Sequence, residues 1–176
     1  MAIDNSRART PSRVRTLFSF PNPVNEVSAR LVAAGVVVMS VLTIAFDLRW
    51  ATIVIAYGFV ARVLTGPTLS PLGQFVTRVV TPRLRIAERP VAGPPKRFAQ
   101  GMGVAFSVTA LVLTGLGYWT AAEVFLGLLA AAAFLESAFG LCLGCKAFAV
   151  LMRVGVVPEE VCERCNDIWG THSATA

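Results

Sequence analysis

A run of 25 residues without one charged side chain, residues 98–122, constrains this chain more than any other feature. A helix that crosses the hydrocarbon core of a bilayer needs about 20 predominantly apolar residues. The chain is 55% hydrophobic and 15% charged, whereas soluble domains carry about 25% charged residues. These features predict an integral membrane protein with the lipid bilayer as its main partner. The net charge of +6 does not indicate nucleic-acid binding, because the arginines flank apolar runs.

Four apolar segments predict an all-α fold with four transmembrane helices. The first covers residues 31–46, and the snorkelling stem of Arg30 extends it to about 20 residues. The second covers residues 50–64 and is short, so the alternative is that these two segments form a shallow hairpin that does not cross the membrane. The uncharged run splits after Gly115 into a third helix and a fourth helix that we expect at 120–150. Small residues spaced four apart in the fourth helix predict close helix packing: Gly127 and Ala131, Ala133 and Ser137, Gly140 and Gly144.

Composition divides the chain into five parts: a polar basic segment at 1–26, a first transmembrane hairpin at 27–64, a basic loop at 65–97, a second transmembrane hairpin at 98–150 and a tail at 151–176. The first part lacks the apolar core of a signal peptide, so we expect the first helix to be retained. Four apolar residues of the loop recur at helical spacing and predict a short amphipathic interfacial helix that ends at Pro82: Leu72, Phe75, Val76 and Val79. Gly93-Pro94-Pro95 predicts a linker before the third helix.

The distribution of basic residues predicts the orientation in the membrane. Four arginines precede the first helix, and six basic residues lie in the central loop: Arg78, Arg83, Arg85, Arg89, Lys96 and Arg97. The opposite turns hold only Arg49, beside Asp47 and Glu123. Since cytoplasmic loops carry the excess of Lys and Arg, both termini and the central loop are expected in the cytoplasm. The expected location is the plasma membrane.

Four cysteines form two C-x-x-C pairs separated by sixteen residues: Cys142 and Cys145, then Cys162 and Cys165. This spacing is typical of a four-thiolate zinc site. Permanent disulfides are disfavoured in the reducing cytosol, so metal binding or reversible thiol chemistry remains. Four thiolates around one Zn²⁺ would hold the tail against the end of the fourth helix and stabilise the fold. No other cofactor is indicated.

The competing interpretation treats one or both C-x-x-C pairs as redox dithiols. This motif lowers the pKa of one thiol, and neighbouring cations such as Lys146, Arg153 and Arg164 favour the thiolate. Such a pair would exchange disulfides with a thioredoxin-like protein or carry sulfur from a sulfurtransferase. The residues alone leave both interpretations open.

Glu136 is the carboxylate well inside the predicted fourth helix, and ionisable residues at such depth are functional candidates. Arg62 lies at a similar depth on the second helix and is the predicted partner of Glu136. The pair either fixes helix packing or relays a proton or ion, the latter as part of a small transporter. On a continuous helix Glu136 would point away from Cys145. His172 is expected to lie in a solvated tail.

Three motifs resemble those of an uncharacterised bacterial family of small membrane proteins, the domain of unknown function numbered 4395. They are Gly66-Pro67 with Ser70-Pro71-Leu72, the segment Gly93-Pro94-Pro95-Lys96-Arg97-Phe98-Ala99-Gln100, and the segment Phe139-Gly140-Leu141-Cys142-Leu143-Gly144-Cys145. The resemblance covers residues 22–150. It implies a membrane protein in which the first cysteine pair matters. The family's association with thioredoxin-like and sulfurtransferase proteins favours thiol chemistry.

The leading hypothesis is a non-enzymatic membrane protein whose tail is held by zinc and whose basic loop docks a partner. The alternative is a membrane relay for thiols or sulfur that uses the C-x-x-C pairs. Motifs for phosphate-binding loops, serine hydrolases and zinc proteases are absent from the sequence, and whether the chain is an enzyme stays open.

Overall fold

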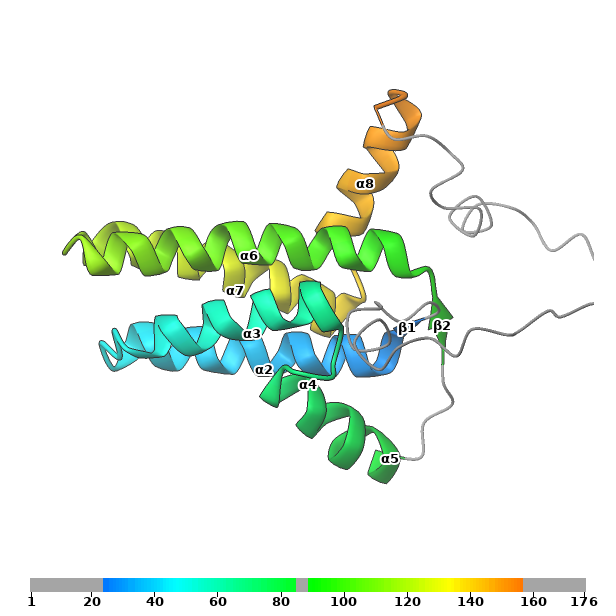
Figure 1. Cartoon of the computed structure of the whole chain (residues 1–176), viewed down its shortest axis with the longest axis horizontal. Helices are drawn as coiled ribbons and strands as arrows, with labels where there is room; N and C mark the ends of the chain where they lie inside the picture. The colour runs from blue at the N-terminus through cyan, green and yellow to red at the C-terminus, as the bar shows by residue number, and fades with distance from the viewer. Residues whose placement is uncertain (1–23, 85–88, 157–176) are drawn as a thin grey trace, which may run out of the picture.

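The computed structural model describes residues 24–84 and 89–156, which form an all-α fold with one short strand pair (Figure 1). The four longest helices are α2 (Glu26–Ala45), α3 (Ala51–Thr65), α6 (Gly93–Gly115) and α7 (Trp119–Phe139). The shorter elements are β1 (Val24–Asn25), α4 (Pro71–Phe75), the π-helix η1 (Val76–Val80), α5 (Thr81–Leu84), β2 (Pro90–Val91) and α8 (Leu143–Arg153). The strands β1 and β2 pair antiparallel, with Val24 opposite Val91 and Asn25 opposite Pro90. The predicted helical class is confirmed.

Three helices, α2, α6 and α7, are long and apolar enough to cross a membrane. The fourth, α3, is apolar but has 15 residues, which is below the usual length of a span. Large apolar side chains such as Val38, Val112 and Leu128 are exposed on the outside of these helices. An outward apolar surface of this kind fits lipid rather than water, so the chain is a membrane protein.

The bundle core forms where α2 packs on α7, α3 packs on α6, and α6 packs on α7. Its centre consists of small and aliphatic residues, including Val36, Ile55, Ala110 and Leu126. Because lipid tails are as apolar as the helix surfaces, helices in a membrane associate through close packing. Small residues at the contacts let the helices approach closely. The four long helices therefore lie side by side with their ends at two common levels (Figure 1).

The two ends of the bundle differ in chemistry. One end carries the strand pair, the segment α4–η1–α5 and α8 (Figure 1). The other end carries the turns after α2 and α6, where Asp47 adopts a positive φ of 52° and Arg49 lies over the Trp119 ring at 5.5 Å. Trp50 and Tyr118 are exposed at this second end. Aromatic residues in this position are typical of a membrane–water interface.

Two helix boundaries differ from the sequence-based expectation. Gly93-Pro94-Pro95 is not a linker but the first turn of α6, because proline lacks only an N–H that the first turn leaves unpaired anyway. The predicted fourth helix is also not continuous to residue 150. It ends at Phe139, where Gly140 adopts a left-handed φ of 69°, and α8 begins at Leu143.

The segment predicted to form an interfacial helix is helical, and the helical structure is longer than expected. Helical structure runs from Pro71 to Leu84 and passes through Pro82. The π-helical turn before Pro82 bonds the Thr81 N–H to the Val76 carbonyl, five residues back. In a regular α-helix a proline ring clashes with the carbonyl four residues earlier. The wider π-helical turn departs from that spacing, so the helix can continue through Pro82. Val76 is buried, so part of the segment packs on the bundle.

Gly103 of α6 faces the ring of Phe59 on α3 so closely that a Cβ there would lie 2.1 Å from the ring. Gly103→Ala should therefore destabilise the fold by about 1–3 kcal/mol through overpacking, measured by thermal unfolding in detergent. Gly101→Ala is the matched control, since its Cβ would meet nothing within 4 Å, and it should be neutral or stabilising. Equal effects of the two substitutions would contradict the close α3–α6 packing.

Candidate functional site at the α7–α8 corner

The first C-x-x-C pair lies at the N-terminus of α8. Cys142 is the N-cap residue, and its Sγ accepts a hydrogen bond from the Cys145 backbone N–H at 3.4 Å. Cys142 is 7% exposed, whereas Cys145 is half-buried. The first N–H groups of a helix have no partner within the helix, and the helix dipole favours negative charge at this end. The position therefore favours a thiolate at Cys142.

The break between α7 and α8 has a defined set of hydrogen bonds. The Gly140 N–H donates to the Glu136 carbonyl at 3.0 Å and the Leu141 N–H donates to the Leu135 carbonyl at 3.1 Å. Left-handed glycine at this position is the usual way to end a helix. Arg30 of α2 donates to the Ser137 carbonyl at 3.0 Å. The guanidinium of Arg30, which we expect near the membrane surface, also donates to the Ala138 carbonyl at 3.0 Å and so satisfies carbonyls at the end of α7.

α8 is held against the start of α6. A Cβ on Gly144 would lie 2.5 Å from the Ala99 Cα, so the two backbones are in close contact there. The rings of Phe98 and Phe148 pack with centroids 5.6 Å apart. Of the small-residue pairs predicted in the fourth helix, Gly144 makes a tight interhelical contact, whereas a Cβ on Gly127 would meet nothing within 4 Å.

A buried ion pair lies beside the cysteines. Lys96 Nζ of α6 donates to Glu136 Oε1 of α7 at 2.6 Å, and both side chains are largely shielded from solvent. The charge of Glu136 also acts on Arg62, but Lys96, which the sequence-based interpretation did not consider as a partner, makes the close ion pair. The sequence holds one indication of this role for Lys96. If Gly93-Pro94-Pro95 is taken as the start of a helix, Lys96 lies in the first turn of that helix.

The two thiols of the pair differ in acidity. The pKa of Cys142 lies below its ordinary value because the Cys145 side chain hydrogen-bonds to it, with Lys96 and the Cys145 N–H acting in the same direction. Burial and the charge of Glu136 oppose this shift. The pKa of Cys145 is raised, first by its hydrogen bond to Cys142 and then by burial. One thiol is thus favoured as thiolate while the other keeps its proton.

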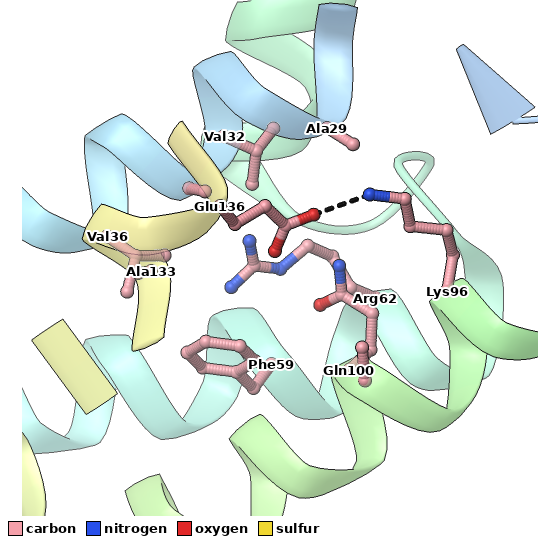
Figure 2. A pocket seen from close by; sticks show the side chains of 11 residues that line it. Ala29, Val32, Val36, Phe59, Arg62, Lys96, Gln100, Ala133 and Glu136 are labelled. Carbon is pink, nitrogen blue, oxygen red and sulfur yellow. Dashed lines mark hydrogen bonds and ion pairs between the residues drawn. The ribbon is translucent and has the colours of Figure 1, made fainter. Parts of the chain in front are cut away.

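Arg62 completes the charged cluster (Figure 2). Its Nε donates to the Gly58 carbonyl at 2.9 Å, and its guanidinium lies over the Phe59 ring at 4.3 Å. Figure 2 shows the guanidinium directed into the same cavity as the Glu136 carboxylate. The structure therefore places Glu136 beside Arg62 in this cavity and within electrostatic reach of Cys142 and Cys145.

Comparison with known proteins assigns the chain to a family. The family model described as a domain of unknown function, DUF4395, matches residues 24–153, which is more than half of the 176 residues. The chain belongs to this family. No curated protein and no solved structure matches it. The DUF4395 match includes the whole corner, with Cys142 and Cys145, and ends before Cys162 and Cys165.

The second C-x-x-C pair and His172 lie outside the described residues. Within residues 24–84 and 89–156, no group of three or more His, Cys, Asp or Glu side chains could hold a metal ion. The described part of this DUF4395 protein therefore offers two sulfur ligands, Cys142 and Cys145. Glu136, which a continuous helix would have turned away from Cys145, acts electrostatically on both thiols because the chain turns at Gly140.

The contact between Gly144 and Ala99 predicts how the corner responds to one added methyl group. Gly144→Ala places the methyl against α6 backbone, which cannot rotate away, so α8 should shift and lose about 1–3 kcal/mol of stability. Hydrogen exchange of α8 amides should accelerate. Gly127→Ala is the control and should leave these amides unchanged. Unchanged exchange in both variants would contradict the docking of α8 on α6.

Proposed function

We propose that this protein is a membrane thiol–disulfide relay in which Cys142 is the nucleophile and Cys145 resolves the intermediate. The observation that carries the proposal is the N–H···S hydrogen bond at the start of α8. This bond places Cys142 at a helix N-terminus, and Lys96 is a neighbouring cation. C-x-x-C cysteines in such surroundings have lowered pKa values. The family match supports the proposal, since it covers this pair and no other cysteine.

The proposed reaction transfers two electrons to a thioredoxin-like partner in its disulfide form. The Cys142 thiolate attacks one partner sulfur, which forms a mixed disulfide and releases the partner's other sulfur as a thiolate. Cys145 then loses its proton and attacks Cys142 Sγ, which breaks the mixed disulfide. The products are a Cys142–Cys145 disulfide and a partner dithiol. The reaction is reversible, and its direction depends on the two reduction potentials.

A sulfurtransferase persulfide is a second possible partner at the same thiolate. The Cys142 thiolate would attack the terminal sulfur of the persulfide, releasing the enzyme's cysteine as thiolate and leaving a persulfide on Cys142. Cys145 could then attack Cys142 Sγ and release hydrosulfide. Both reactions use the same two cysteines and end in a Cys142–Cys145 disulfide, with a partner dithiol as product in the first case and hydrosulfide in the second.

The proposed orientation places the corner, both termini and the basic loop in the cytoplasm of a bacterial inner membrane. It is supported by the position of Lys96, Arg97 and the α4–α5 segment at the same end as α8 (Figure 1). We further propose that α3 is a fourth, short span. Its 15 residues reach about 22 Å at 1.5 Å per residue, with Trp50 at one interface and Arg62 near the other.

A structural zinc site formed by Cys142, Cys145, Cys162 and Cys165 is the second candidate. The observation that favours it is the sequence spacing of the two C-x-x-C pairs. The N–H···S bond at Cys142 suits a zinc-bound thiolate as well as a nucleophile, so two ligands of the four fit. In this case the tail would be held at the corner and the basic loop would dock a partner.

Thiol exchange and metal content separate the two candidates. In full-length detergent-purified protein carrying Cys162→Ser and Cys165→Ser, oxidised thioredoxin should still produce the Cys142–Cys145 disulfide, and Cys142→Ser should abolish it. Cys145→Ser should trap the mixed disulfide. Because the pKa of Cys142 is lowered, the exchange rate should rise with pH and reach half its maximum at a lower pH than for an unperturbed cysteine.

The contrary result is equally clear. One zinc per chain in the wild-type protein, lost in both Cys142→Ser and the double tail variant, together with no thiol exchange, would support the zinc site and exclude the relay. Elemental analysis of the same samples measures the metal.

The orientation predicts which single cysteines are reached from outside intact cells. In a cysteine-free background, Tyr118→Cys should react with an impermeant maleimide in intact cells, because Tyr118 is exposed at the end opposite the corner. Leu84→Cys, at an exposed position of α5, should react only after permeabilisation. The reverse pattern would invert the topology and place the thiols outside the cytosol.

A further inference from the structure

The cluster beside the corner contains more positive than negative charge. Arg62 and Lys96 contribute two positive charges and Glu136 one negative charge, which leaves one positive charge over these three residues. Arg62 is 6% exposed and Lys96 is 9% exposed. A buried charge without a counter-charge costs several kcal/mol. Lys96 makes the ion pair with Glu136, and Arg62 interacts electrostatically with the same carboxylate, so one negative charge serves two buried cations.

The guanidinium of Arg62 borders space that a ligand can fill. A cavity of about 40 Å³ lies between Arg62, Lys96, Gln100 and Glu136 (Figure 2). A second cavity of about 210 Å³ shares Arg62 and Gln100 with the first. A single water needs only about 10–15 Å³ of such volume. The two neighbouring cavities therefore have room for a small anion near the guanidinium.

The larger cavity carries polar groups at the end of the bundle where the strand pair lies. Its walls include Asn25, Ser28 and Thr77. The Asn25 Oδ1 accepts the Val27 N–H at 3.0 Å, which leaves its amide nitrogen as a donor. The Ser28 hydroxyl shares a hydrogen bond of 3.0 Å with the hydroxyl of Thr81. The Thr77 hydroxyl donates to the Gly73 carbonyl, so the Asn25 amide and the Ser28 hydroxyl are the donors of this otherwise mostly apolar cavity. Such donors beside a guanidinium are groups that oxyanions bind.

One wall residue lacks a donor. Gln100 lines both cavities, and its Oε1 is buried without a hydrogen-bond partner. A buried acceptor left unpaired costs about 1–3 kcal/mol. An oxyanion that retains one proton carries the donor that this oxygen lacks, whereas a fully deprotonated oxyanion does not.

We propose that the cavities beside Arg62 form a binding site for a phosphate-like oxyanion that keeps one hydroxyl. Arg62 supplies the charge, Gln100 accepts from the hydroxyl, and Asn25 and Ser28 lie within the same cavity. The ligand is either free phosphate or the phosphomonoester headgroup of a lipid, because the site lies at the end of the helices. This site is separate from the thiol relay and does not require it.

The test uses the full chain in nanodiscs of phosphatidylcholine, titrated at constant ionic strength with inorganic phosphate or with dioctanoyl phosphatidic acid. The thermal midpoint should rise and saturate with one of the two, which identifies the source. Arg62→Gln should weaken binding at least tenfold. Glu136→Gln should tighten binding several-fold, because it removes the competing carboxylate and frees Lys96. These opposite shifts distinguish a binding site from general destabilisation.

Arg83→Gln is the matched control, because Arg83 is exposed and lies outside both cavities, and it should leave the affinity unchanged. Cys142→Ser should also leave it unchanged. No saturable effect of either phosphate compound, or equal losses in Arg62→Gln and Arg83→Gln, would overturn the site. If Arg62→Gln does not fold, failure of Glu136→Gln to tighten binding overturns it. Sulfate binding as tight as phosphate would overturn the hydroxyl-bearing oxyanion.

Discussion

The ion pair between Lys96 and Glu136 connects the first turn of α6 with the last turns of α7. In a membrane protein each of these charges is stable only beside the other, since removing one partner leaves an uncompensated buried charge. The pair therefore sets the register of α6 against α7. Both the cysteine corner and the cavity at Arg62 lie beside this contact, so their geometry depends on it.

The chemistry of the corner follows from the interruption of the helix. Had α7 continued, the Cys145 N–H would have bonded to a carbonyl four residues earlier. Because Gly140 ends α7 and a new helix starts at Leu143, that N–H lies in a first turn and donates to the Cys142 sulfur. The same break brings Glu136 and Lys96 within electrostatic reach of both thiols. A change of direction in the backbone thus creates the asymmetry between two chemically identical side chains.

Positive charge concentrated at one end of the bundle has two consequences in this fold. Toward α8, Lys96 favours the thiolate form of Cys142. Toward α3 and the strand pair, the guanidinium of Arg62 borders a mostly apolar cavity that also carries the polar side chains of Asn25 and Ser28. The basic residues that orient a membrane protein are thereby also available for binding anions. The close contacts at Gly144 and Gly103 keep α8 and α3 against α6, which holds both features in place.

The sequence alone determined the helical class and the membrane setting. They follow from the order of apolar and charged residues along the chain, because each sufficiently long apolar segment can enter the bilayer as a helix. The tertiary structure decided the partner of Glu136, because Lys96 is forty residues away and only the packing of α6 on α7 brings them together. It also decided the break at Gly140, since a left-handed glycine there is stabilised by Arg30 from another helix, a contact that no local pattern encodes.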